Sequence, residues 1–584
     1  MTGVAATKAK AWRHAGGVIR ANPWSFLASV GFYVGFFSLV LIPGLLNRAI
    51  FDALSGHAAN FNVWSLVGLL IGLELGRFGL LYFGGVLFNV FRYGGEALLK
   101  RNMMDWLVSA PGPRVLPGSP GEAVSRFRDD VIETLNLSTI LIVSPQVLTG
   151  VAAFAVMLHI NALITLVVAA PIVATVALTY LLTRRIQGYR KASREATAAV
   201  TSFIGETFGA VQSIKLAAAE DRVAARLKTL NERRRAASIR DLMFSSLLSF
   251  LNSNIAALGT GCVLLLAAQA MRQGAFTVGD FTLFATYLGL VSAAPLMLGQ
   301  ILAIERQSGV SIGRMRGLMD GSPALQLVAR PARRHLTAPP MPPPAPLRTL
   351  TVRGLTCSHP ASGRGVRDID LTLNRGQFVV ITGRVGAGKT TLLRALLGLV
   401  PRDGGEIAWN GEIVADPASF MIPPRCAYTA QAPRLFSETI GDNVRMGESA
   451  SAEAVADAVR LAVFEQDLAG FEAGLDTLVG TRGVTLSGGQ LQRAAAARMF
   501  VRQTDLLVFD DISSALDMPT EQALWRGLFA SGERTCLAVS HRREAFLRAD
   551  EIILLDEGRI VARSDAAGLR RESDLFREIW RHDD

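Results

Sequence analysis

The stretch Gly383–Thr390 carries the spacing G-x-x-x-x-G-K-[ST]. In this pattern the glycines let backbone N–H groups close around phosphate oxygens, and the start of the next helix adds positive potential. The flanks have the required form, because the apolar run Phe378–Ile381 predicts a buried strand and Thr391–Leu397 predicts a helix. We expect Lys389 to reach the β- and γ-phosphates of a nucleotide, and the Thr390 hydroxyl to ligate Mg²⁺.

Further motifs follow along the chain. Leu506–Asp510 is an apolar run ending in a carboxylate, and it predicts a buried strand whose Asp510 holds Mg²⁺ through water. Leu486–Gln490 has the sequence L-S-G-G-Q and precedes a predicted helix. The motifs occur in an order that resembles the ATPase half of ATP-binding cassette (ABC) transporters, namely the phosphate loop, Gln431, L-S-G-G-Q, Asp510, Ser514–Asp517 and His541.

The resemblance implies a role for each matching residue. Gln431 would contact Mg²⁺ and the attacking water, and His541 would approach the γ-phosphate. Ser487 and nearby backbone N–H groups would form an anion site for the γ-phosphate bound by an opposite subunit, with Asp517 at that subunit seam. The implied ATP-binding residues are His359, Gly383, Arg384, Val385, Gly386, Ala387, Gly388, Lys389, Thr390, Thr391, Ser487, Gly488, Gly489, Gln490 and Asp517; the catalytic residues are Asp511, His541 and Gln431; the Mg²⁺ ligands are Thr390, Gln431 and Asp510.

Three positions depart from the family's pattern. The general base after Asp510 is normally glutamate, and here it is Asp511. An aspartate is one methylene shorter, and a misplacement of about 1 Å can cost on the order of a hundredfold in rate. His359 stands where a tyrosine usually stacks on adenine, and Thr481 replaces an acid ahead of L-S-G-G-Q. We therefore expect slow hydrolysis at the site built on Asp511.

Length and composition indicate a membrane protein of several domains. The chain has 584 residues, of which 50% are hydrophobic, and its net charge is +11. No basic stripe interleaved with aromatic residues is present, so we do not expect nucleic-acid binding. The cysteines Cys262, Cys357, Cys426 and Cys536 lack metal-ligand spacing and are expected to be reduced thiols. We also expect no cleaved signal peptide, because the first apolar run is long enough to span the bilayer.

Six apolar stretches precede residue 310, each near or above the ~20 residues that cross a bilayer as a helix. The alternative, buried helices of a large soluble protein, fits their number and length poorly. Basic residues concentrate between the second and third stretches and between the fourth and fifth, which places these loops and the N-terminus in the cytoplasm. The predicted spans are 25–47, 62–90, 138–158, 162–183, 243–270 and 278–304.

Segments outside the spans have patterns of their own. Ser119–Glu122 predicts the start of a cytoplasmic helix, and turns near 112–120 and 207–215 are expected to contact the ATPase half. Residues 321–347 are a proline-rich linker, and 348–584 form the nucleotide-binding domain, with a hairpin turn at Asn410–Gly411 in a small β-subdomain. Within the second span, Glu74 and Arg77 share a helix face and belong either to a transport path or to an ion pair that fixes packing.

The predicted fold is an α-helical six-span transmembrane domain, residues 1–320, joined to an α/β P-loop ATPase domain with a small antiparallel β-subdomain. The resemblance implies an ATP- and Mg²⁺-dependent exporter of a hydrophobic or amphipathic solute, located in the cytoplasmic membrane among its lipids. The partner would be a second half-transporter, and Asp511 favours a different chain over an identical one. The alternatives are a slowly hydrolysing homodimer, a membrane ATPase that does not transport, and a ligand-gated channel.

Overall fold

The computed structural model describes residues 2–56, 61–109, 120–329, 345–359, 363–480, 486–513, 516–530 and 534–581. The chain divides into two compact units. We call Met1–Leu107 with Leu116–Pro331 the helical unit, and Val108–Val115 with Ala332–Asp584 the sheet unit. Each unit is described by itself.

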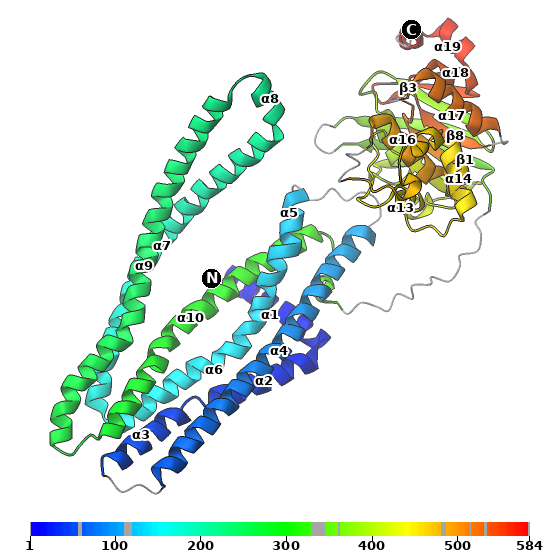
Figure 1. Ribbon diagram of the computed structural model, residues 1–584. Coiled ribbons are helices and arrows are strands. Elements are labelled where there is room, and N and C mark those ends of the chain that lie inside the picture. The colour runs from blue at the N-terminus through cyan, green and yellow to red at the C-terminus, as the bar shows by residue number, and fades with distance from the viewer. Residues whose placement is uncertain are drawn as a thin grey trace. The chain divides into compact units, whose positions relative to one another are not determined.

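The helical unit consists of long helices, shown from blue to green in Figure 1. Pro23 lies at the start of one helix, and Pro171 lies inside another. The elements are α1 Thr2–Ala21, α2 Pro23–Ser38, α3 Ile42–Leu54, α4 Val63–Ser109, α5 Pro120–Ser125, the π-helix η1 Arg126–Asp130, α6 Val131–Ile160, α7 Ala162–Gly209, α8 Val211–Leu216, α9 Glu220–Arg272, α10 Val278–Leu318 and the 3₁₀ helix η2 Gln326–Val328.

Each predicted span overlaps these helices, with α2 and α3 together covering the first. Within the described residues, four helical stretches are long and apolar enough to cross a membrane: Pro23–Leu54, Val63–Val108, Gly121–Ile160 and Val278–Leu318. The residues between the third and fourth predicted spans, 159–161, contain a break at Asn161, whose φ of −154° ends α6 and whose side chain accepts a hydrogen bond from Ile164 N to cap α7. The full count of six spans stays a prediction.

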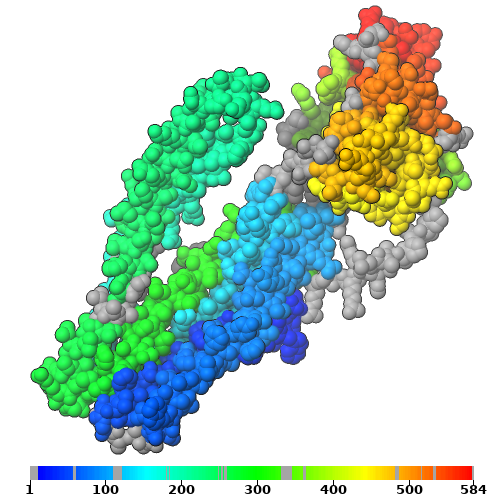
Figure 2. Space-filling view, viewed as in Figure 1, coloured from blue at the N-terminus to red at the C-terminus, as the bar shows by residue number. Residues whose placement is uncertain are grey.

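Two helices run far beyond the length of a bilayer span. α7 has 48 residues and α9 has 53, so each is about 70–80 Å long at 1.5 Å per residue. They pack along each other as an antiparallel pair joined through α8, and in Figure 2 the outer part of this pair stands clear of the other helices of the unit. α8 falls at the turn expected near 207–215, and its Leu216 is 90% exposed. The other expected turn, 112–120, lies outside the described residues except for Pro120, which begins α5.

The two charged residues of α4 form an ion pair. Arg77 Nη1 donates to Glu74 Oε1 at 2.5 Å, and the guanidinium lies 5.1 Å from the centroid of the Phe36 ring on α2. The Arg77 side chain is 15% exposed, whereas that of Glu74 is 50% exposed. For Arg77, these contacts favour the ion pair that fixes helix packing over a role in a transport path. A charge at this depth is expected to avoid lipid. A role for the half-exposed Glu74 carboxylate in a transport path therefore stays a prediction.

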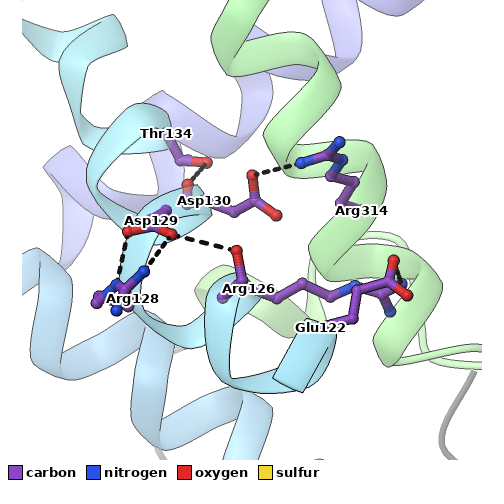
Figure 3. Close-up of polar contacts among 8 residues, drawn as sticks. Glu122, Arg126, Arg128, Asp129, Asp130, Thr134 and Arg314 are labelled. Atoms are coloured by element: carbon purple, nitrogen blue, oxygen red, sulfur yellow. Dashed lines mark hydrogen bonds and ion pairs between the residues drawn. The ribbon is translucent and has the colours of Figure 1, made fainter. Parts of the chain in front are cut away.

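A cluster of charges surrounds the π-helix η1 at the start of α6 (Figure 3). Arg126 and Asp130 are both buried, and Arg126 Nη2 donates to Glu122 Oε1 at 2.7 Å. Asp130 lies 3.8 Å from Arg314 of α10, and its backbone oxygen accepts from Thr134 Oγ1. Single π-turns interrupt the regular α-helical register. Both charged side chains of this turn are buried, with Arg126 paired to α5 and Asp130 facing Arg314 of α10.

The sheet unit contains two sheets. The smaller one is antiparallel with the order β2-β1-β4-β5, and Asn410 and Gly411 have φ of 55° and 89°, which confirms the tight hairpin turn between β4 and β5. The larger sheet has the order β10-β9-β3-β8-β7-β6, with only β10 antiparallel to its neighbour. The strands are β1 Thr349–Ser358, β2 Gly365–Asn374, β3 Phe378–Gly383, β4 Gly404–Trp409, β5 Glu412–Ile413, β6 Cys426–Thr429, β7 Leu506–Asp510, β8 Thr535–Val539, β9 Glu551–Asp556 and β10 Arg559–Ser564.

The central strands β3, β7 and β8 are buried at every residue, which is typical of a parallel sheet covered on both faces. Two large apolar clusters supply that cover. The helices are α11 Lys389–Leu396, α12 Pro417–Phe420, α13 Ile440–Arg445, α14 Ala452–Leu461, α15 Glu465–Ala469, η3 Gly474–Asp476 (3₁₀), α16 Gly488–Phe500, α17 Met518–Ala530, α18 Arg543–Arg548, α19 Ala566–Glu572 and α20 Asp574–Arg581. The predicted combination of a helical membrane region with an α/β domain is confirmed.

An accessibility experiment tests the orientation of the helical unit. A cysteine replacing Gly56, just after α3, is expected to react with a membrane-impermeant thiol reagent added to intact cells. A cysteine replacing Ser193, in α7, is expected to react only after the cells are opened. The parent chain is the background control, since three of its four cysteines are buried and Cys262 is partly buried. The reverse labelling pattern would invert the topology.

Candidate nucleotide-binding site

The site is assembled where four neighbouring parallel strands end. The phosphate loop follows β3, His541 follows β8, Asp511 follows β7 and Gln431 follows β6, and these strands are consecutive in the sheet order β3-β8-β7-β6. The carboxyl ends of parallel strands meet at one edge, where ligands of open α/β sheets bind. Residues that are far apart in the sequence are thereby brought together.

The phosphate loop depends on glycine at both ends. At Gly383, where φ is 147°, an added Cβ would lie 2.0 Å from the carbonyl oxygen of Leu555 on β9. At Gly388, where φ is 99°, it would lie 2.9 Å from Val366. Both backbone conformations are unfavourable for other residues. The loop therefore owes its close turn to β9 and β2 as much as to its own sequence.

Lys389 begins α11 with its ammonium inside the loop. Its Nζ donates to the backbone oxygens of Gly383 at 2.8 Å and Arg384 at 2.9 Å. Burial lowers the pKa of Lys389, and the carboxylates of Asp511 and Asp510 oppose that shift. These contacts hold a cation beside the loop amides, where a bound phosphate would meet it.

The Thr390 hydroxyl and the Asp510 carboxylate lie together and provide oxygen ligands suited to a small hard cation. Thr390 Oγ1 donates to Asp510 Oδ1 at 3.2 Å, and among the described residues no group is placed to hydrogen-bond the other, buried carboxylate oxygen of Asp510. Burial raises the pKa of Asp510, and the hydrogen bond from Thr390 and the charges of Arg394 and Lys389 counteract it. The nearby Tyr428 hydroxyl also helps to lower the pKa of this carboxyl. A buried carboxylate with an unsatisfied oxygen fits Mg²⁺, which prefers carboxylates, hydroxyls and water.

Asp511 occupies a strained backbone position at the end of β7. Its φ is 57°, in the left-handed region, and its N–H donates to the Val539 oxygen at 3.0 Å. Burial raises the pKa of Asp511, and the adjacent Asp510 charge raises it further, while Arg542 and a hydrogen bond with Gln431 act in the opposite direction. Strain of this kind in a non-glycine residue is often found at functional sites.

These residues line one cavity of about 260 Å³. Gly383, Arg384 and Ala387 belong to the same loop but do not line the cavity, and Val539, at the end of β8, is a lining residue that sequence reasoning missed. Its only sequence signal was its place at the end of an apolar run. The lining residues are Val385, Gly386, Gly388, Lys389, Thr390, Thr391, Gln431, Asp510, Asp511, Val539 and His541.

The remaining predicted site residues lie outside that cavity. His359 directly follows β1 of the smaller sheet, and its backbone N–H donates to the Arg364 oxygen at 2.7 Å. Ser487–Gln490 form the start of α16, and Asp517 directly precedes α17. Thr481 lies outside the described residues. The roles of these residues in binding ATP stay predictions.

Comparison with known proteins agrees with both units. A family model described as the ABC transporter transmembrane region matches residues 26–294, and a family model described as ABC transporter matches residues 366–514. An ATP-dependent lipid A-core flippase from Chromobacterium violaceum is 27% identical over 500 residues, covering 82% of this chain and 81% of that protein. The flippase from Bordetella pertussis is 26% identical over 537 residues, covering 91% and 84%.

Two further similarities extend over nearly the whole chain. A multidrug efflux ATP-binding/permease protein from Mycobacterium tuberculosis is 27% identical over 560 residues, which are 94% of this chain and 45% of that longer protein. The solved structure of a bacterial Atm1-family ABC exporter with ATP bound has the same fold, with a TM-score of 0.73, 23% identity and coverage of 94% of this chain and 98% of that one. This chain therefore belongs to the ABC transporters, as an exporter that joins a transmembrane region and an ATP-hydrolysing domain in one polypeptide.

Proposed function

We propose that this ATP-driven exporter moves a lipid-like or amphipathic solute across the cytoplasmic membrane, as the subunit of a heterodimer that carries the slower ATP site. Mg²⁺ is the proposed metal, held at Thr390 and Asp510 with Gln431. Asp511 is the observation that carries the heterodimer proposal. It lies in the cavity beside Lys389 and His541, where the family's glutamate would act as general base.

Two properties of Asp511 oppose efficient base catalysis. Its side chain is one methylene shorter than glutamate, and positioning errors of about 1 Å can cost on the order of a hundredfold. Its backbone is fixed in the left-handed region by the hydrogen bond to Val539 on β8, which limits how far the carboxylate can be moved toward the water. Both features slow this site without removing its capacity to bind ATP.

The L-S-G-G-Q segment of the same chain, Leu486–Gln490, which we call the signature segment, is intact. Ser487 caps α16 by accepting from Gln490 N, and the segment lies outside the cavity at Lys389. Such a helix start can bind a phosphate held by another subunit. In a heterodimer it would complete a faster site on the partner, whereas in a homodimer both sites would contain the short base. This asymmetry favours a different partner chain.

The substrate class rests on the relatives and on the spans. Two of the similar proteins are named as lipid A-core flippases and one as a multidrug efflux protein. The membrane helices of this chain also expose many large apolar side chains, among them Leu75, Phe78 and Phe83 of α4. The names of the relatives support an amphipathic substrate with a substantial apolar part, whereas the apolar helix surfaces fit helices that face lipid.

ATPase measurements on this chain expressed alone test the heterodimer proposal. We expect little turnover from the lone chain, and robust turnover only when a second ABC chain co-purifies with it. Asp511→Asn should leave the activity of that mixed assembly largely unchanged, because the partner's site turns over faster. Robust hydrolysis by the lone chain that is lost in Asp511→Asn would instead show a homodimer in which Asp511 is the working base.

Reconstituted vesicles separate transport from the other membrane activities. We expect ATP-dependent movement of a fluorescent phospholipid or amphipathic dye between leaflets or into the lumen. ATP hydrolysis without such movement would favour a non-transporting ATPase. Ion currents much faster than ATP turnover would favour a channel.

A further inference from the structure

The hydrogen-bond donors at the start of α16 fall into two groups, namely those used within the helix start and those in the first turn that have no acceptor inside the helix. Gln490 N donates to Ser487 Oγ at 3.3 Å, and Ser487 N donates to Gln490 Oε1 at 2.9 Å, which together form a capping box. The amides of Gly488 and Gly489 lie in the first turn, where a helix offers them no internal acceptor. Because Ser487 Oγ already accepts from Gln490 N, its own hydrogen is available to donate. Among the residues that the structure describes, neither the Ser487 hydroxyl hydrogen nor the two glycine amides have an acceptor, so all three can serve an incoming phosphate.

The capping box is itself held by a carboxylate from another helix. Gln490 uses its Oε1 within the box, and its Nε2 donates to Asp467 Oδ1 on α15 at 3.1 Å. Arg493, three residues after Gln490 on the same face of α16, clamps both Asp467 oxygens through Nε at 2.8 Å and Nη2 at 3.0 Å. The side chains of Arg493 and Asp467 are only 14% and 17% exposed.

This arrangement differs from an ordinary surface ion pair. Arg460 and Asp457, on helix α14, also form an ion pair at 2.5 Å. Their side chains are 63% and 55% exposed, respectively, and neither residue belongs to the signature segment. Exposed pairs of that kind contribute little to a fold. The mostly buried and bidentate pair at Asp467 is stronger and fixes direction as well as distance.

We propose that Asp467 is a positioning residue for ATP hydrolysis, which orients Ser487 and the first amides of α16 through Gln490 and keeps Arg493 neutralised beside the anion site. The inference rests on the proposed function in one respect, namely that this segment serves an ATP bound by the partner subunit. Without Asp467, the Gln490 amide loses its acceptor and the Arg493 guanidinium is left without its bidentate counter-charge. The serine hydroxyl would then meet the γ-phosphate in the wrong orientation.

The test uses the purified full-length assembly and compares kcat with KM for ATP. Asp467→Asn, which keeps the size of the side chain, is expected to lower kcat at least tenfold with less than a threefold change in KM, because the loop that holds the nucleotide is untouched. Asp457→Asn is the matched control and should retain wild-type kcat and KM. A wild-type kcat in Asp467→Asn, or a loss confined to KM, would overturn the proposal.

Exchange of donor and acceptor separates positioning from a general structural role. In the double variant Asp467→Asn with Gln490→Glu, the new amide can donate to the new carboxylate, which still accepts from Ser487 N and keeps one negative charge near Arg493. We expect kcat at least fivefold above that of Asp467→Asn alone, as a double-mutant cycle detects direct coupling. Because Gln490 is itself a predicted ATP-binding residue, Gln490→Glu alone is measured as the other single variant of the cycle. A kcat in the folded double variant that is no higher than the product of the two single effects predicts would contradict the proposal.

Ser487→Ala distinguishes the inference from the function on which it rests. If Ser487→Ala leaves kcat unchanged, the signature segment does not serve a partner's ATP and the proposed function fails at that point. If Ser487→Ala lowers kcat and Asp467→Asn does not, the signature is used but Asp467 does not position it. A similar fall of kcat in both variants, with an unchanged melting temperature, supports both statements.

Discussion

Lys389→Ala is expected to abolish tight ATP binding and, with it, ATP-driven export. The lysine ammonium is the mobile positive charge of the phosphate loop, now held by the oxygens of Gly383 and Arg384, and an alanine leaves the triphosphate with backbone amides alone. Losing a charge-assisted contact of this kind should weaken binding by at least about a hundredfold, or roughly 3 kcal/mol. Binding of a fluorescent ATP analogue to the full chain in detergent provides the measurement.

Lys389→Arg is the matched variant for this experiment. It keeps the charge, but the planar guanidinium is too large for the space in which the ammonium contacts two carbonyl groups, so we expect a loss almost as large. Arg353→Ala serves as the control for the loss of one positive charge, since Arg353 is exposed on β1 and lies outside the cavity lining. Unchanged affinity in Lys389→Ala would remove the phosphate-loop assignment.

Gly383→Ala is expected to destabilise the sheet unit by several kcal/mol, roughly 3 or more. The new Cβ would lie 2.0 Å from the Leu555 oxygen, and the clash involves backbone on β9 rather than the end of a flexible side chain. The residue also has a φ of 147°, which side-chain-bearing residues rarely adopt. Relief would require β3 and β9 to separate, although Gly383 and Leu555 are paired in the ladder.

Gly527→Ala provides the contrasting control. Gly527 lies in α17 and has nothing within 4 Å of an added Cβ, so alanine should be neutral or stabilising by up to ~1 kcal/mol. Resistance to limited proteolysis and the thermal midpoint of the sheet unit, followed in the full chain, should therefore fall in Gly383→Ala and not in Gly527→Ala. Equal stability of the two variants would show that β9 can move away at low cost.

Local patterns were sufficient for most of the architecture. The G-x-x-x-x-G-K-T spacing, the acid at the end of Leu506–Asp510 and the L-S-G-G-Q segment each depend on a few adjacent residues, and each lies on the predicted element. The apolar stretches likewise predicted helices, because a run of about 20 apolar residues has few alternatives in a membrane. The hairpin turn at Asn410–Gly411 follows from the tolerance of both residues for positive φ.

Contacts between distant segments could not be obtained in this way. The order β3-β8-β7-β6 brings Lys389, Asp511, His541 and Gln431 to one cavity, and strand order depends on packing over the whole sheet rather than on any local signal. Val539 lines that cavity only because β8 lies between β3 and β7. The left-handed backbone of Asp511 has no local signal either, and it occurs where the N–H of Asp511 donates to Val539 at the end of β8.

The sequence by itself determined which chemistry this protein contains, because nucleotide-binding motifs are short and their backbone requirements are local. Only the tertiary structure decided how that chemistry is oriented. Asp467 shows the difference, since nothing in its own segment marks it, and its partners Gln490 and Arg493 are 23 and 26 residues away. A side chain's direction is set by the elements packed around it, and those contacts exist only after the chain has folded.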